Sequence, residues 1–245
     1  MSRLQQEKEF HNTRFEGEED PRAGLDKYYS IAKSSRKFFQ DLYQSNYKDK
    51  RVLEYGCGTG NNSIKIARGS KTVTGIDISD EAINKANKAI PGNIQNVTFC
   101  VMDAENLEFP DYSFDLIFGS GILHHLKLEN AYAELLRVLA ANGTAVFFEP
   151  LGHNPIINLY RKITSNLRTE DEHPLLIQDL RLAEKYFKVV EVAYFHITSL
   201  CAIPLRNSPF FDKTVGFFEY IDKALIYLIP PLRRYAWIVV IRLST

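Results

Sequence analysis

The sequence predicts an α/β fold built on a mostly parallel sheet. Apolar segments of strand length, such as 52–55, 72–76 and 114–118, alternate with segments of helical periodicity. This alternation is typical of a parallel sheet covered by helices. The first strand runs directly into a turn with glycine at positions 56, 58 and 60. Glycines there let a ligand approach the backbone where a Cβ would collide, so we predict a ligand site at the end of this strand.

We expect a helix directly after the glycine turn. Residues 61–67 place Ile64 and Ala67 on one side, and the free N–H groups at the start of such a helix would face the ligand. The dinucleotide fingerprint requires a third glycine where this chain has Asn61. That mismatch disfavours a nicotinamide or flavin enzyme. The alternative is that the glycines serve only the tight turn from strand to helix and bind no ligand.

The next two strands each end in a carboxylate. Asp77 follows 72–76, about twenty residues after the first glycine, where an acidic side chain would accept hydrogen bonds from ribose hydroxyls. Asp103 follows the strand 97–102, and its carboxylate would reach an adenine amino group. The fourth strand is followed by Gly119, Ser120, His124 and His125.

In this order, these motifs resemble those of the class I S-adenosylmethionine-dependent methyltransferases. The resemblance covers roughly residues 50–150 and rests on 54–60, Asp77, 103–104 and 114–126. It implies S-adenosylmethionine as the cofactor and S-adenosylhomocysteine as the product. It also implies a three-layer sandwich with a Rossmann-like, seven-stranded, mostly parallel sheet whose last strand is antiparallel.

The resemblance assigns roles to individual residues. It implies that Glu54 and Gly56 line the aminocarboxypropyl chain, that Asp77 binds the ribose and that Asp103 binds the adenine amine. Ala104 would supply a backbone N–H. The other predicted cofactor-binding residues are Cys57, Gly58, Gly60, Ile78, Gly119, Ser120 and Tyr28. We interpret Cys57 as a small filler of the turn rather than a nucleophile. Tyr55 is bulkier than the residue usual at its position, so the packing beneath the turn is not predicted.

Composition favours a single domain and disfavours nucleic acid as a partner. The chain has 245 residues, and its 30 lysines and arginines equal its 30 aspartates and glutamates, so no net positive field attracts a polyanion. The N-terminus lacks the apolar core of a signal peptide, and no apolar segment is long enough to span a bilayer. Three scattered cysteines predict a reducing, cytoplasmic setting.

We divide the chain into three parts. Residues 1–45 comprise a polar tail, either mobile or ordered over the cofactor, and a helix from Leu25 to about Ser45. Its aromatic face is either core or, at Tyr28 and Tyr29, a wall of the pocket, where aromatic rings suit a sulfonium. Residues 46–198 and 236–245 form the methyltransferase domain. Residues 199–235 form an aromatic helical insertion: a hairpin on the sheet edge, a lid over an acceptor pocket or, third, a protein or membrane contact.

Within the second half we expect two further helices and three strands. The helices are 130–139 and 177–186. The strands are 144–148, introduced by a turn at 142–143, then 189–194 and finally 236–241.

Histidines are the candidate catalytic residues. Methyl transfer is an in-line displacement that mainly needs alignment and exclusion of water, but a base assists when the acceptor is a hydroxyl. His153, after the fifth strand, and His124 and His125, after the fourth, are the candidates. A structural role is the alternative for each, and it is favoured for His124. His173 lies in an acidic loop, 169–174, whose adjacent side chains do not converge, so we predict no metal.

The function we predict is S-adenosylmethionine-dependent methylation of a small-molecule acceptor on oxygen or nitrogen, in secondary metabolism, with a homodimer left open. One alternative is a non-catalytic partner that binds S-adenosylmethionine. Others are a nicotinamide oxidoreductase and a methyltransferase that modifies proteins or other macromolecules. Nucleic-acid methylation lacks support because the chain has no Asn-Pro-Pro-Tyr type motif.

Overall fold

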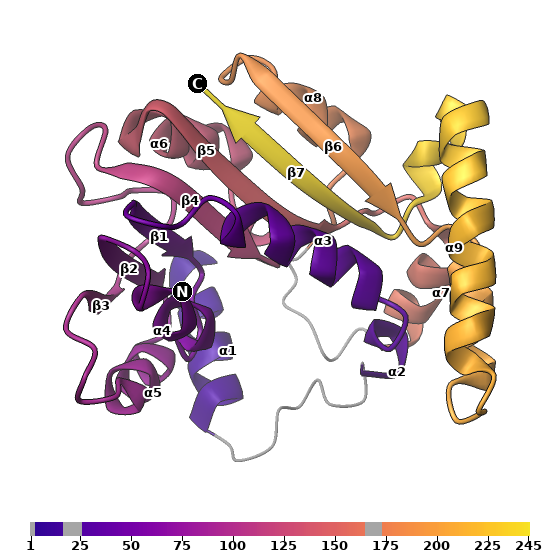
Figure 1. Cartoon of the computed structure of the whole chain (residues 1–245), viewed down its shortest axis with the longest axis horizontal. Helices are drawn as coiled ribbons and strands as arrows, with labels where there is room; N and C mark the ends of the chain where they lie inside the picture. Colours follow the sequence, from indigo (N-terminus) through magenta and orange to yellow (C-terminus); the bar gives the residue numbers. More distant parts are fainter. Residues whose placement is uncertain (1–2, 17–25, 165–172) are drawn as a thin grey trace.

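The computed structural model describes residues 3–16, 26–164 and 173–245. Seven strands form one sheet in the order β3-β2-β1-β4-β5-β7-β6 (Figure 1). Neighbouring strands are parallel except β7, which runs antiparallel to both β5 and β6. The strands are β1 (Arg51–Tyr55), β2 (Thr72–Asp77), β3 (Val97–Val101), β4 (Phe114–Ser120), β5 (Leu139–Pro150), β6 (Val189–Phe195) and β7 (Ile238–Ser244). This confirms the predicted sheet and its antiparallel last strand.

Helices cover both faces of the sheet. They are α1 (Arg3–Glu16), α2 (Asp26–Tyr29), α3 (Lys33–Gln44), α4 (Asn61–Ala67), α5 (Asp80–Ala89), α6 (Leu128–Val138), α7 (Pro155–Ile163), α8 (Ile177–Ala183) and α9 (Phe211–Leu228). Short 3-10 helices are η2 (Leu123–His125), η4 (Ser199–Leu205) and η5 (Pro230–Tyr235).

Successive strand residues point to opposite faces and so build two cores. Val52 and Leu116 pack into the core that includes α3, α4 and α5. Their neighbours Leu53 and Ile117 pack into the core that includes α6 and α8. Because both faces of these strands are buried, the strands read as continuous apolar runs. The three-layer sandwich predicted from the sequence is therefore confirmed.

The strand order reverses between β1 and β4, which are hydrogen-bonded neighbours. From β1 the chain builds one half of the sheet through β2 and β3, and from β4 it builds the other half. Loops that leave the carboxyl ends of β1 and β4 therefore diverge in opposite directions. A crevice forms at such a point in open α/β sheets and is the usual place for a ligand.

The N-terminal part differs from the sequence prediction. Residues 3–16, in which we found no sustained periodicity, form α1. The single helix expected from 25 to 45 is divided into α2 and α3 by a turn. The two neighbouring tyrosines of α2 meet different partners: the ring of Tyr28 lies 4.0 Å from that of Tyr160, and the ring of Tyr29 lies 5.2 Å from that of Trp237.

The expected turn before β5 is a bulge inside a longer strand. Leu139 already pairs with Phe114, and the register shifts before Thr144 pairs with Leu116. The extra residues are accommodated where Asn142 adopts φ 60°, a left-handed conformation that asparagine tolerates better than most residues. The predicted turn residues thus mark an irregularity of the strand rather than its beginning.

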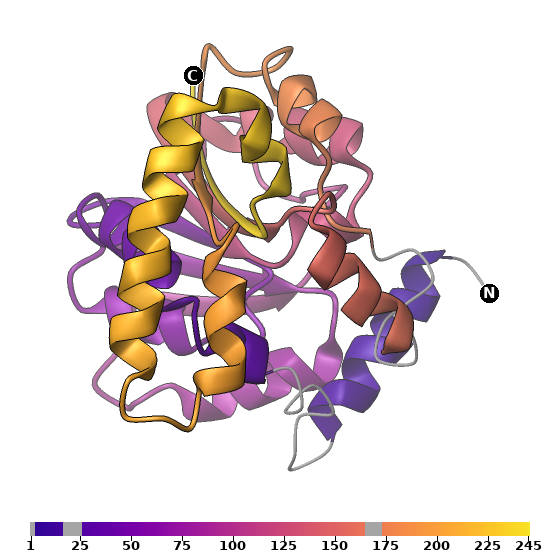
Figure 2. The same cartoon turned by 90° about the vertical axis from the view of Figure 1, so that its right-hand side faces the viewer.

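The insertion lies at the edge of the sheet beside β6. Figure 2 shows α9 upright along this edge, with α7 on the same side of the molecule. The buried carboxylate of Asp222 in α9 accepts hydrogen bonds from the backbone N–H groups of Ile197 and Thr198, at 3.1 and 2.6 Å. The outer side of α9 exposes Phe217, Tyr220, Tyr227 and Leu228. Among the described residues, no helix is long and apolar enough to cross a membrane.

A buried histidine fastens this edge to α3. His196 Nε2 lies 2.8 Å from Ser35 Oγ, and His196 Nδ1 lies 3.0 Å from Ser199 Oγ. The histidine is 1% exposed and has φ 65°. Burial lowers its pKa to about 4, so His196 is neutral at pH 7 and donates one of these hydrogen bonds while accepting the other.

We expect His196 to make the protein sensitive to acid. Below the unfolded-state pKa of about 6.5, the unfolded chain binds a proton that the folded chain excludes until about pH 4, so stability falls with pH across that window. His196→Asn keeps a residue that tolerates positive φ but does not titrate. Between pH 7 and pH 5 the wild type should lose about 2 kcal/mol relative to this variant in urea unfolding. Equal pH dependence of the two proteins would contradict the assignment.

Candidate functional site

A cavity of about 340 Å³ opens at the carboxyl ends of β1, β2 and β4, a volume typical of small-molecule sites. Its walls are the glycine turn after β1, the end of β2, the loop after β3, the loop after β4 and one side of α1. The cavity thus lies at the point where the strand order reverses.

Most of the predicted cofactor-binding residues line this cavity. They are Glu54, Gly56, Cys57, Gly58, Asp77, Ile78, Asp103, Ala104 and Ser120. The described lining does not include Gly60, Gly119 or Tyr28. Tyr28 packs on Tyr160 instead, so the structure brings it together with α7 rather than with the cavity.

The two glycines outside the lining are explained by packing. Gly60 has φ 75°, and a Cβ there would lie 2.3 Å from Cζ of Phe99. A Cβ on Gly75 would also meet the Phe99 ring, at 2.6 Å, so the buried ring is enclosed between two glycines. A Cβ on Gly119 would lie 2.7 Å from the carbonyl oxygen of Tyr55. Gly60 and Gly119 therefore permit close contacts beneath the cavity.

Glu54 joins the sheet to the helix after the turn. Its Oε2 accepts hydrogen bonds from Ser63 N–H at 2.9 Å and Ser63 Oγ–H at 2.6 Å, and its Oε1 accepts one from Asn62 at 2.9 Å. Burial raises the pKa of this carboxyl to about 7, although the hydrogen bonds from Ser63 and Asn62 oppose the shift. The carboxyl group therefore changes charge near neutral pH while facing the cavity.

Asp77 fixes the glycine turn from the neighbouring strand. Its Oδ2 accepts a hydrogen bond from Gly58 N–H at 2.8 Å, and its Oδ1 accepts one from Ser79 N–H at 3.0 Å. Each oxygen has a second lone pair for a ligand hydroxyl. Within this turn, burial raises the pKa of the Cys57 thiol. The thiol is therefore neutral at pH 7, which agrees with its interpretation as a small side chain that fills space rather than a nucleophile.

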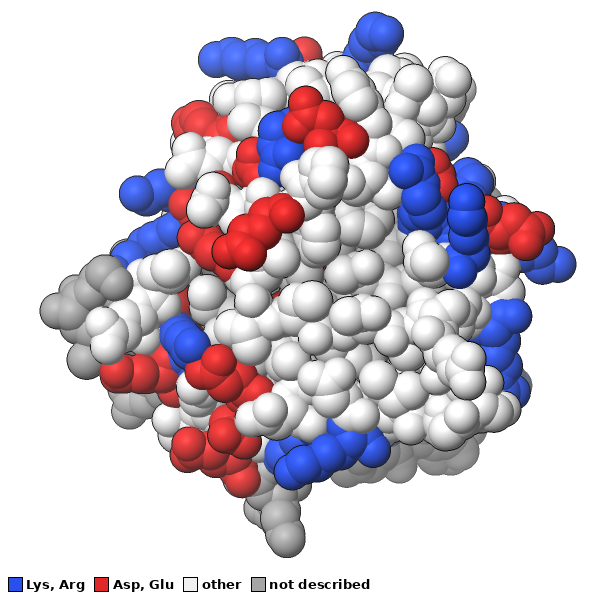
Figure 3. All heavy atoms as spheres, turned by 90° about the vertical axis from the view of Figure 1, so that its left-hand side faces the viewer, with Lys and Arg blue, Asp and Glu red and all other residues white. Residues whose placement is uncertain are grey.

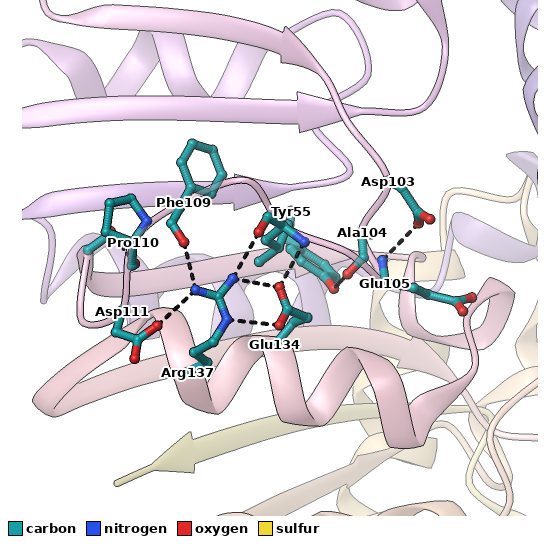
Figure 4. Close-up of polar contacts among 11 residues, drawn as sticks. Tyr55, Asp103, Ala104, Glu105, Phe109, Pro110, Asp111, Glu134 and Arg137 are labelled. Atoms are coloured by element: carbon teal, nitrogen blue, oxygen red, sulfur yellow. Dashed lines mark hydrogen bonds and ion pairs between the residues drawn. The ribbon is translucent and has the colours of Figure 1, made fainter.

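Tyr55 holds the loop after β3 against the end of β1. Its side chain is fully buried, and its hydroxyl donates a hydrogen bond to the carbonyl of Ala104 (Figure 4). In the same loop, Asp103 Oδ1 accepts a hydrogen bond from Glu105 N–H at 2.8 Å. The bulky residue whose packing the sequence left unpredicted therefore positions two of the proposed adenine contacts.

Arg137 of α6 anchors the rest of this loop (Figure 4). Its guanidinium donates to the carbonyl oxygens of Phe109 at 2.6 Å and Leu107 at 2.8 Å. The same group forms a two-point ion pair with Glu134, whose Oε2 also accepts a hydrogen bond from Leu107 N–H at 2.8 Å. A planar cation with five donors suits this role. The loop is therefore fastened before any ligand binds.

The helix α1 forms a wall of the cavity. The sequence analysis left this segment as either mobile or ordered over the cofactor, and it did not predict a helix there. Arg3, Glu7, His11 and Phe15 recur at helical spacing and all line the cavity. The helix is held by residues distant in sequence. Arg3 donates a hydrogen bond to the carbonyl oxygen of His125 at 3.0 Å and forms an ion pair with Glu105. Lys8 forms an ion pair with Asp80 at 2.7 Å, and Asn12 Oδ1 accepts a hydrogen bond from Ser79 Oγ–H at 2.7 Å. The sequence indicates this helix only through the four-residue spacing of Arg3, Glu7, His11 and Phe15, and three of the four are polar, so the pattern does not read as an apolar helical face.

The candidate histidines occupy different surroundings. His124 is buried beside Glu149, with Nδ1 2.7 Å from Oε2, while Oε1 of Glu149 accepts from the N–H groups of Ile122 and Leu123, both at 2.9 Å. Glu149, which sequence reasoning did not select, thus fixes η2. His125 lines the cavity. His124 does not belong to the described lining.

His153 lies in a separate hollow with Arg181, Tyr194 and Arg234. Its Nε2 accepts a hydrogen bond from Ile177 N–H at 3.3 Å, and burial, followed by the charge of Arg234, lowers its pKa. The next residue, Asn154, is buried and caps α7. The structure therefore does not bring His153 to the cavity.

Most of the acidic loop expected at 169–174 lies outside the described residues, which exclude 169–172. The N–H of His173 donates a hydrogen bond to the carbonyl oxygen of His124 at 3.4 Å.

Charges of both signs are interspersed over the face shown in Figure 3. Basic and acidic side chains surround an uncharged centre, without a continuous basic surface among the residues described on that face. This distribution agrees with the formal net charge of zero.

Fold and cavity together define a class I methyltransferase domain. Residues 52–143 match the methyltransferase domain family, so this part of the chain belongs to that family. A fatty-acid O-methyltransferase of Mycolicibacterium smegmatis is 32% identical over 134 residues, which are 51% of this chain and 47% of that protein. A 27-O-demethylrifamycin SV methyltransferase of Amycolatopsis mediterranei is 38% identical over 97 residues, 39% of this chain and 30% of that protein. The chain thus spans about half, or less, of these relatives.

A solved structure extends the similarity of fold to the whole chain. Geranyl diphosphate C-methyltransferase from Streptomyces coelicolor A3(2), in complex with Mg²⁺, geranyl diphosphate and S-adenosylhomocysteine, superposes with a TM-score of 0.67. It is 14% identical, and the match covers 100% of this chain and 98% of that one. At this identity the likeness concerns the fold alone.

We expect Gly60→Ala to destabilise the fold by about 2–5 kcal/mol. A left-handed alanine costs about 1–2 kcal/mol, and pressing its methyl group against the enclosed ring of Phe99 adds about 1–3 kcal/mol. Gly92→Ala is the matched control, because a Cβ there has no described neighbour within 4 Å. Urea unfolding of both variants measures the difference. A similar loss in both would show that the Phe99 contact does not constrain position 60.

Proposed function

We propose that this protein transfers a methyl group from S-adenosylmethionine to a small-molecule acceptor. The observation that carries the proposal is the cavity in which Glu54, Asp77 and Asp103 stand at the ends of three adjacent strands. Carboxylates so placed suit the ammonium, ribose and adenine groups of this cofactor in turn. Family membership supports the same assignment.

The protein's part in the reaction would be alignment and exclusion of water. The cofactor supplies a methyl group on an already activated leaving group, so an acceptor held in line can attack without elaborate catalysis. In our proposal Glu54 and Gly56 hold the methionine end, and Phe15 and Phe39 supply apolar wall on the methionine side. His125, which faces the cavity, is the base best placed to take a proton from a hydroxyl acceptor.

We further propose an apolar acceptor that is methylated on oxygen, as part of secondary metabolism. The cavity lining includes Phe15, Phe39, Met102 and Ile122, which suit an apolar molecule. The two relatives named above carry fatty-acid and rifamycin acceptors in their names, which supports this class. Three expectations from the sequence stay predictions. They are the division of the chain into three parts, the possible lid role of 199–235 and the possible homodimer. The described lining contains no residue of that insertion.

Removal of the Asp77 carboxylate should weaken cofactor binding at least about tenfold. Charge-assisted hydrogen bonds to the ribose would be lost, each worth about 1.5–3 kcal/mol. Calorimetric titration of Asp77→Ala with S-adenosylhomocysteine tests this. Asp41→Ala is the control, because Asp41 is exposed on α3, where it forms an ion pair with Lys37 of the same helix. Unchanged affinity of a folded Asp77→Ala protein would refute the ribose assignment.

Cofactor binding should release a proton near neutral pH through Glu54. With a pKa of about 7 this carboxyl is partly protonated in the free protein, and an ammonium group beside it favours the charged form. Affinity for S-adenosylhomocysteine should therefore rise as pH increases through 7. Calorimetry in two buffers with different ionisation enthalpies counts the protons released. Glu54→Gln should abolish the release.

Glu149→Gln is the matched control for that experiment. Glu149 is also buried, with a pKa raised to about 7 by burial, but it lies outside the described lining of the cavity. It should leave the proton count unchanged. If Glu149→Gln abolishes the release and Glu54→Gln preserves it, the ammonium does not bind beside Glu54.

A further inference from the structure

Three side chains with metal-binding atoms converge where α1 crosses η2. Glu7 and His11 are one turn apart on the same face of α1, and His125 ends η2. Glu7 Oε2 lies 3.5 Å from His11 Nε2 and 3.5 Å from His125 Nδ1. Ligand atoms of all three residues lie within 4.8 Å of one another. Two separate parts of the chain therefore supply one compact set of donors.

These separations fit a shared ion better than direct hydrogen bonds. An N–H···O hydrogen bond spans about 2.7–3.2 Å, which is shorter than either distance from Glu7. Ligands bound to zinc at about 2.0–2.1 Å in tetrahedral geometry stand about 3.4 Å apart. Both measured distances are close to this value. The third pair, between His11 and His125, lies within 4.8 Å.

The chemistry of the donors points to the same conclusion. Two imidazoles and one glutamate are a ligand set of catalytic zinc sites, in which a fourth position stays open for water or substrate. Glu7 and His125 are 7% and 6% exposed, and all three residues line the cavity. The open position would therefore face the cavity rather than bulk water.

We propose that Glu7, His11 and His125 bind a divalent transition-metal ion, with zinc as the cation that fits best. The role of this ion rests on the proposed function: it would hold the acceptor hydroxyl and lower its pKa. This role would replace the one proposed above for His125 as a base, because an imidazole bound to zinc is not free to take a proton. The hydroxyl proton then passes to solvent, the oxygen forms a bond to the methyl carbon, and the carbon–sulfur bond breaks with its electron pair left on sulfur. The sequence analysis predicted no metal from the acidic loop 169–174 alone, and it did not consider the residues of α1 as ligands.

The experiment measures zinc binding by the full chain after treatment with a chelator. Calorimetry with zinc chloride should give one site. Cobalt substituted at the same site should give the intense visible absorption of a tetrahedral centre. Since losing an outer-sphere partner already costs about 10–100-fold in metal affinity, His11→Ala and Glu7→Gln should each weaken binding by about 100-fold or more.

His153→Ala is the matched control, because His153 lies in a separate hollow with Arg181 and Arg234. It should bind zinc like the wild type. Folding of the other variants is checked by circular dichroism, and α1 keeps its contacts through Arg3, Lys8 and Asn12 in each of them. No zinc binding by the wild type, or binding unchanged in both His11→Ala and Glu7→Gln, would overturn the metal site and leave the three residues as a proton-transfer cluster.

A parallel titration with S-adenosylhomocysteine separates this proposal from the proposed function. Binding of S-adenosylhomocysteine without binding of zinc overturns the metal site alone. Zinc binding that needs His11 and Glu7, with no binding of S-adenosylhomocysteine, supports the metal site and overturns the methyltransferase assignment.

Discussion

The cavity depends first on the buried carboxylate of Glu54. A carboxyl group is costly to bury without partners, and here Asn62 and Ser63, at the start of α4, supply three hydrogen bonds. These bonds fix α4 relative to β1, so the intervening glycine turn has one conformation. Asp77 then accepts a hydrogen bond from Gly58, which joins the next strand to the same turn. At the edge of the sheet that faces the cavity, neighbouring elements are thus joined by side-chain hydrogen bonds as well as by the backbone hydrogen bonds between strands.

Features that depend on local pattern were predictable. The bounds of α4 agree with the expected 61–67, because an apolar face of helical period follows directly after the glycines. Asp77 and Asp103 were selected because each follows an apolar strand, and parallel strands bring their carboxyl ends to one edge. Both line the cavity.

Features that depend on tertiary contacts were not predictable. The helix α1 is stabilised through Arg3, Lys8 and Asn12, whose partners are distant in sequence, and its cavity side is largely polar. His153 was selected for its position after β5, but the cap that Asn154 forms at the start of α7 directs the chain so that His153 meets Ile177. Glu149 was not predicted as a site residue, because its hydrogen bonds to the backbone at the start of η2 form only in the folded chain.

The attachment of α1 has a kinetic consequence. This helix walls the cavity, so movement of the helix away from the sheet would ease the release of a bound cofactor. Its attachments include the ion pairs of Arg3 with Glu105 and of Lys8 with Asp80, and dissolved salt weakens partly exposed pairs of this kind. The residence time of a bound molecule would then shorten as ionic strength rises. Turnover limited by product release would accelerate in salt, whereas turnover limited by chemistry would not.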